Sequence, residues 1–133
     1  MSETIFTKII NGDIPGHFIY EDDTCVAILD AFPAVRGQSL VIPKQPEPYV
    51  FALPEDVYQH LFLVAKRIST VLDTELDTVR TCLVVEGFEV PHTHIKLYPM
   101  REETPLGAIM QQQTEANQAE LATLAQTLKT QLG

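Results

Sequence analysis

Two histidines and a lysine alternate along one short segment of the chain. His92, His94 and Lys96 are each separated by a single residue in the run PHTHIKLYP over residues 91–99. In a β-strand, side chains alternate between faces and the backbone rises about 3.3 Å per residue, so successive members of this trio lie on one face about 7 Å apart. Neutral imidazole is a nucleophile, and a neighbouring ammonium group binds anionic oxygens.

Three interpretations of this strand remain open on pattern alone. The first is a solvent-exposed sheet face with incidental histidines. The second is a metal site, because His-x-His on a strand is a common ligand pair, although Lys96 would then repel the cation. The third is covalent catalysis, in which His94 attacks a phosphorus centre and the neighbouring cations stabilise charge on the phosphate oxygens.

The elements that must position this strand follow from hydrophobic periodicity and turn residues. We expect helices over residues 3–10, from Pro54 onward and over 115–132, and strands over 17–20, 25–30, 39–43, 81–85 and 92–98. The short turn at residues 21–23 makes the first two strands antiparallel. The pattern predicts an α+β fold with a mainly antiparallel sheet, one long helix, a short N-terminal helix and a C-terminal helix.

Composition restricts the function further. The chain has 133 residues, which suits one domain, and a formal net charge of -9, which disfavours a nucleic-acid partner. It contains no apolar run of 18 residues, so we expect no membrane span, and the start Met1-Ser2-Glu3 carries no signal-peptide pattern. Cys25 and Cys82 lie in apolar strand-like runs and are expected to be buried, reduced thiols of a cytoplasmic protein. His60 lies next to the apolar stripe of the long helix and is interpreted as a helix-surface or partly buried residue.

The segment around the two histidines resembles the signature of the histidine triad (HIT) superfamily, His-x-His-x-His followed by two apolar residues. Further segments fall in family order between about residues 3 and 100: TIFTKII at 4–10, DIP at 13–15, YEDD at 20–23, AILD at 27–30 and LVIPK at 40–44. The resemblance implies a HIT-like fold over residues 1–104, followed at 105–133 by a linker and a helix packing on the same domain. It also implies a homodimer formed through the long helix and a neighbouring strand.

The resemblance assigns a role to each matching position. His94 matches the nucleophile that takes up the nucleoside monophosphate, and His92 matches the first triad histidine, which helps orient the site. Lys96 stands at the third histidine, where the family contacts the phosphate oxygens. Asp30 matches the acid that binds the ribose hydroxyls. Five apolar residues match the family's positions that form the walls around the base: Ile5, Phe6, Ile9, Ile28 and Leu29.

Other positions depart from the family pattern. Gln38 replaces a histidine often found after the loop, and Phe88 and Glu89 replace polar residues near the phosphate; we expect all three at the nucleotide site. Thr4 and Thr7 occupy positions where some relatives carry a Cys-x-x-Cys zinc pair. Because threonine is a poor zinc ligand, we expect no structural metal and no cofactor.

The resemblance implies a nucleotidyl hydrolase or transferase acting through His94. Its substrates would be adenosine or guanosine phosphoramidates or dinucleoside polyphosphates, and its small-molecule partner a purine nucleotide such as AMP or GMP. The alternatives are a nucleotide sensor without catalysis and a dimeric interaction module with a degenerate triad.

Overall fold

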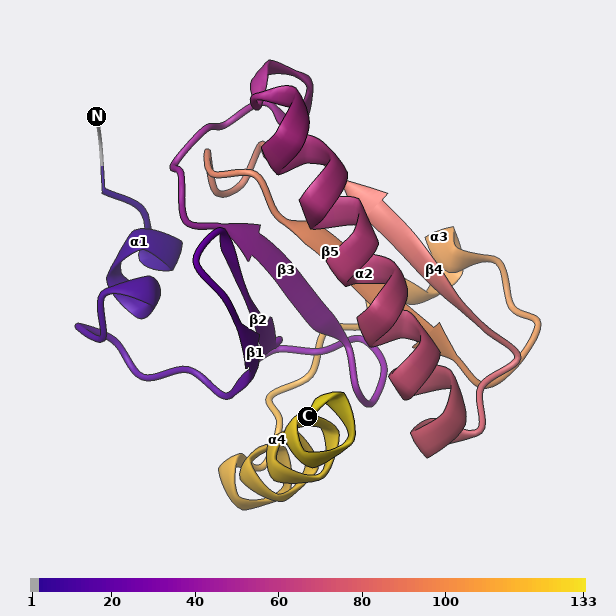
Figure 1. Ribbon diagram of the computed structural model, residues 1–133. Helices are drawn as coiled ribbons and strands as arrows, with labels where there is room; N and C mark the ends of the chain where they lie inside the picture. Colours follow the sequence, from indigo (N-terminus) through magenta and orange to yellow (C-terminus); the bar gives the residue numbers. More distant parts are fainter. Residues whose placement is uncertain (1–2) are drawn as a thin grey trace.

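Five antiparallel strands form one sheet in the order β1-β2-β3-β5-β4 (Figure 1). The computed structural model describes residues 3–133. Met1 and Ser2, on which the signal-peptide expectation partly rests, lie outside the described residues. In chain order the elements are α1 (Ile5–Ile10), β1 (Phe18–Glu21), β2 (Cys25–Leu29), β3 (Ser39–Pro43), the 3-10 helix η1 (Val50–Ala52), α2 (Glu55–Leu76), β4 (Arg80–Val85), β5 (Ile95–Met100), α3 (Leu106–Ile109) and α4 (Gln118–Leu132). The predicted α+β fold with a mainly antiparallel sheet is confirmed.

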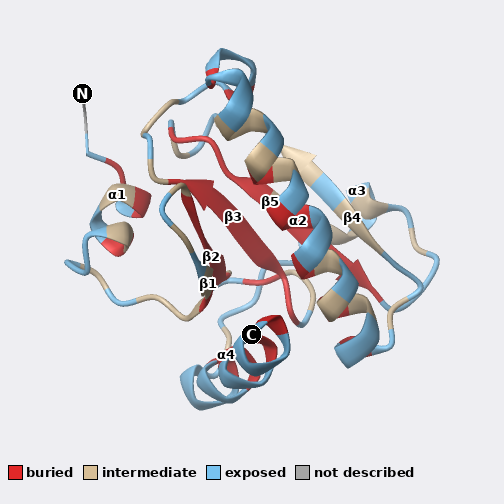
Figure 2. Ribbon diagram, in the orientation of Figure 1, coloured by how far each residue is buried: buried red, intermediate tan, exposed pale blue. Residues whose placement is uncertain are grey.

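Each face of the sheet packs against different helices. On one face, Ala27, Val41 and Ile95 join the apolar stripes of α2 and α4 in the larger core. On the other face, Val26, Ile28, Leu40 and Ile42 pack against Phe6 and Ile9 of α1. Figure 2 shows the consequence: the central strand β3 is buried along its length, whereas the edge strand β4 is half-buried or exposed.

The helices begin where the sequence supplies caps. Thr4 caps α1, since its hydroxyl accepts a hydrogen bond from Thr7 N–H while the Thr7 hydroxyl accepts from Thr4 N–H. Pro54 precedes α2, whose first turn carries Glu55 and Asp56 near the positive end of the helix dipole.

Most predicted boundaries differ from the structure by one or two residues, and two predicted starts differ by three. The last strand begins at Ile95 rather than His92, because Pro91 has no N–H to donate and Thr93 N–H donates to Glu47 O in a loop instead of to the sheet. The tail helix begins at Gln118 rather than at 115, where Asn117 accepts a hydrogen bond from Glu120 N–H. Among the described residues, no helix is long and apolar enough to cross a membrane.

The turn before β3 requires glycine at position 37. Gly37 has φ +86°, and a Cβ built on it would collide with Leu76 Cδ1 and lie 3.3 Å from Pro99 Cγ. We expect Gly37→Ala to lower the free energy of unfolding by about 3 kcal/mol, because left-handed strain and overpacking add.

Gly12→Ala is the matched control for this substitution. Gly12 has a similar φ of +85°, but nothing lies within 4 Å of a Cβ built there. We expect Gly12→Ala to lower the free energy of unfolding in urea by only about 1 kcal/mol, from backbone strain alone. Equal losses for the two variants would contradict the packing argument.

Candidate functional site

A cavity of about 380 Å³ opens on the sheet face that α1 covers. Nine of the residues predicted for the site line it: Ile5, Phe6, Ile9, Ile28, Leu29, Asp30, Glu89, His94 and Lys96. They come from α1, from β2 and its C-terminal end, from the loop before β5, and from β5 itself. Apolar walls thus surround a few charged groups, which is the usual composition of a small-ligand site.

The imidazole of His94 is held in one tautomer by the chain itself. Its Nδ1–H donates to the main-chain oxygen of His92 at 2.8 Å, which leaves the lone pair on Nε2. The residue is 4% exposed, and its ring packs in a T-shaped arrangement with the Phe6 ring at a centroid distance of 4.8 Å. Among the described residues, none donates to or accepts from Nε2, so this nitrogen is the one available to a ligand in the cavity.

Burial and charge keep His94 neutral. Burial lowers the pKa of His94 below its ordinary value, and the positive charge of Lys96 lowers it further. Two effects raise the pKa without reversing the shift. They are the hydrogen bond to the His92 carbonyl and the negative charge of the Asp30 carboxylate. The neutral ring is the form that can attack an electrophile.

His92 faces away from the cavity and has a different role from His94. It is fully buried, its Nε2–H donates to Pro43 O at 2.8 Å, and its Nδ1 accepts from the Thr4 hydroxyl at 3.1 Å. Burial also lowers the pKa of His92. The side chain therefore fixes the loop whose carbonyl orients His94, and Thr4 couples that loop to the cap of α1.

Gln38 supports Asp30 from behind the cavity wall. Its Nε2 donates to Asp30 Oδ2 at 2.9 Å, and its Oε1 accepts from Ala34 N–H at 2.7 Å. Asp30 Oδ1 accepts from Phe32 N–H at 2.9 Å. Gln38 is 2% exposed and does not line the cavity, so it orients the carboxylate rather than meeting a ligand directly.

The remaining predicted position, Phe88, lies apart from the cavity lining and is 87% exposed. Conversely, the cavity includes residues that the sequence did not indicate. Gln113 and Gln118 reach it from the C-terminal segment, and Gln118 Oε1 pairs with His17 Nε2 at 2.9 Å. No periodic signal in the sequence predicts that Gln118 meets His17, which lies 101 residues earlier in the chain.

Comparisons with known proteins show the family and agree with the fold. Residues 11–103 match the HIT domain family. An uncharacterised HIT-like protein of Synechocystis is 37% identical over 99 residues, covering 72% of this chain and 85% of its own. Adenylylsulfatase HINT3 of Arabidopsis thaliana is 33% identical over 112 residues, or 80% of this chain and 57% of its own. The crystal structure of a hypothetical histidine triad nucleotide-binding protein from Sulfolobus tokodaii superposes with a TM-score of 0.81 at 27% identity, covering 96% of this chain and 90% of the other.

The protonation of His94 can be measured directly. In nitrogen-detected NMR we expect His94 to titrate below the usual pKa of about 6.5 and to carry its proton on Nδ1 above it. Lys96→Met should raise this pKa, because the imidazolium form loses an unfavourable neighbouring charge. Lys66→Met, on α2 across the sheet, should leave it unchanged. A wild-type pKa at or above 6.5, or no response to Lys96→Met, would contradict the assignment.

Proposed function

The chain belongs to the HIT domain family, and from that premise we propose that it is a nucleotidyl hydrolase or transferase whose nucleophile is His94. The observation that carries the proposal is the free Nε2 of a neutral His94 in one cavity with Asp30 and Lys96. The substrates proposed are phosphoramidates or dinucleoside polyphosphates of adenosine or guanosine, with AMP or GMP as the product.

The cavity suggests how such a substrate would lie. The base would pack between the apolar residues of α1 and β2, and the ribose hydroxyls would donate to the Asp30 carboxylate, which Gln38 holds in place. Lys96, opposite Leu40 in the register of β3 and β5, would contact the oxygens of the α-phosphate. His92 is proposed to act through its carbonyl, as a residue that positions His94.

The proposed reaction proceeds by two displacements. In the first, His94 Nε2 attacks the α-phosphorus; a nitrogen–phosphorus bond forms and the bond to the leaving amine or phosphate breaks, with the leaving group taking a proton from water. In the second, water attacks the phosphohistidine, releases the monophosphate and regenerates neutral His94. The His92 carbonyl stabilises the positive ring in between, because it accepts the remaining Nδ1–H. Lys96 supplies a fixed positive charge for the phosphate oxygens.

A nucleotide sensor is the second candidate, and Glu89 favours it. Glu89 lines the same cavity as His94 and Lys96, where a negative charge would oppose an incoming phosphate. AMP binding in calorimetry without any monophosphate release would select the sensor. A dimeric interaction module would bind no AMP.

Proposals about assembly and location accompany this function. The edge strand β4 exposes Leu83, which is 45% exposed, and α2 exposes Leu63, which is 65% exposed; together they suit a homodimer formed through these two elements. Cys25 and Cys82 are both free thiols, which fits the reducing cytoplasm. We also propose a domain boundary after residue 104, with α4 packing back on the core through Leu128.

Steady-state hydrolysis of an adenosine phosphoramidate tests the catalytic proposal. His94→Ala should lower the rate of AMP release about a thousandfold or more, because it removes the attacking nitrogen. Lys96→Met should lower kcat/KM by about a hundredfold, and Lys96→His should retain more activity than Lys96→Met. Lys66→Met, on the opposite face of the sheet, is the control and should match the wild type. Full activity in His94→Ala would refute the proposal.

Sedimentation velocity tests the proposed dimer. Leu83→Glu should convert a dimer into a monomer, since it buries a charge at the centre of the proposed contact. Thr123→Glu, on the exposed side of α4, should leave the mass unchanged. A monomeric wild type, or a dimer that survives Leu83→Glu, would rule out this interface.

A further inference from the structure

A second group of reactive side chains lies outside the nucleotide cavity. Asp22 in the turn between β1 and β2, Cys25 at the start of β2 and His60 on α2 bring their ligand atoms within 4.8 Å of one another. Cys25 packs in the core with Leu61 of α2, so this group lies on the sheet face opposite to the cavity. The proposed nucleotide chemistry uses none of these three residues.

Asp22 is oriented by its neighbours before any ligand binds. Its Oδ1 accepts from the N–H groups of Thr24 at 2.8 Å and Cys25 at 2.9 Å. Its Oδ2 accepts from the Tyr20 hydroxyl at 2.7 Å and contacts His60 Nε2 at 2.6 Å. Hydrogen bonds that fix a carboxylate in this way are typical of the groups surrounding metal ligands.

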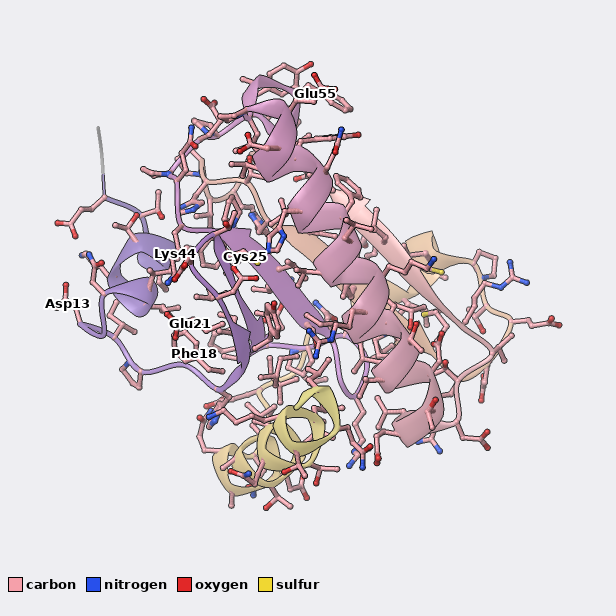
Figure 3. The ribbon with its side chains drawn as sticks, viewed as in Figure 1. Asp13, Phe18, Glu21, Cys25, Lys44 and Glu55 are labelled. Carbon is pink, nitrogen blue, oxygen red and sulfur yellow. The ribbon has the colours of Figure 1, made fainter. Side chains whose placement is uncertain are left out.

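The Cys25 thiol is the unusual member of the group. It is 0% exposed, and burial together with the Asp22 carboxylate raises its pKa to about 12. The adjacent cation Lys44 is paired with Glu21, with Nζ and Oε2 3.0 Å apart, in the same region of the sheet (Figure 3). A buried thiol, a carboxylate and an imidazole therefore lie together at the margin of the core.

We propose that Asp22, Cys25 and His60 bind a zinc-class divalent ion and leave a fourth position open to water beside His60. A thiolate, an imidazole and a carboxylate form a donor group that suits zinc and disfavours calcium or magnesium. The side chains of His60 and Asp22 are 40% and 24% exposed, so an ion can enter from solvent. This site is separate from Thr4 and Thr7, on which the expectation of no structural metal rested.

Binding requires only small movements. Bonds of about 2.0 Å to zinc place tetrahedral nitrogen and oxygen ligands about 3.3 Å apart, so the 2.6 Å contact between His60 Nε2 and Asp22 Oδ2 opens slightly as the ion replaces the shared proton. The ion also displaces the proton of the Cys25 thiol, which leaves to solvent. Affinity should therefore rise with pH. The bound ion would tie the β1–β2 turn to α2.

Cobalt and zinc titrations of the chelator-treated full chain test the proposal. We expect one ion per chain, a thiolate-to-cobalt charge-transfer band in the near ultraviolet, and a higher melting temperature with zinc. Cys25→Ser should remove the band, and His60→Gln and Asp22→Asn should each weaken binding about tenfold or more. Cys82→Ser and His17→Gln, which change the other free cysteine and a histidine elsewhere, should leave the spectrum unchanged.

The result that overturns the proposal is also spectroscopic. An ion bound without a thiolate band, a band that survives Cys25→Ser, or a band lost in Cys82→Ser would place the metal elsewhere. If Cys25→Ser fails to fold, His60→Gln decides, because the His60 side chain is 40% exposed and is not part of the buried core. Cobalt affinity unchanged in a folded His60→Gln protein would refute the site.

Discussion

The hydrogen bond from His94 Nδ1–H to the carbonyl of His92 is the interaction on which the rest of the site depends. It fixes the tautomer and leaves the Nε2 lone pair as the only reactive feature of a buried ring. It also requires the loop before β5 to be rigid. That rigidity comes from the His92 side chain, which is tied to Pro43 O and to the Thr4 hydroxyl. A residue outside the cavity thus controls the group inside it.

The two faces of the sheet serve different purposes. One face supports the cavity with the short helix α1, which leaves room for a ligand between Phe6, Ile28 and Leu40. The other face is closed by α2 and α4 and forms the larger core, with the Asp22–Cys25–His60 group at its margin. A small helix on one side and two longer helices on the other leave one face open to a ligand and the other closed by the core.

The sequence predicted the parts of the molecule that local pattern controls. The strand at 39–43 agrees with β3 at both ends, and Pro54 marks the start of the long helix. Nine of the predicted site residues line the cavity: the alternate spacing predicted that His94 and Lys96 lie together, and the family pattern supplied the other seven. The orientation of the His92 side chain depends on a contact with Thr4, 88 residues away in the chain, which local pattern does not predict. Tertiary packing, which no short motif encodes, likewise brings Gln113 and Gln118 to the cavity. It also brings His60 next to Cys25.

The central claim is that the His94 ring becomes covalently attached to the nucleotide. Rapid mixing of the protein with an adenosine phosphoramidate, followed by acid-free quenching and intact-mass and peptide mass spectrometry, measures this attachment directly. We expect a transient mass increase of one AMP residue, located on His94 and absent from His94→Ala. Release of AMP with no adduct on His94 at any reaction time, or an adduct located on another residue, would contradict it.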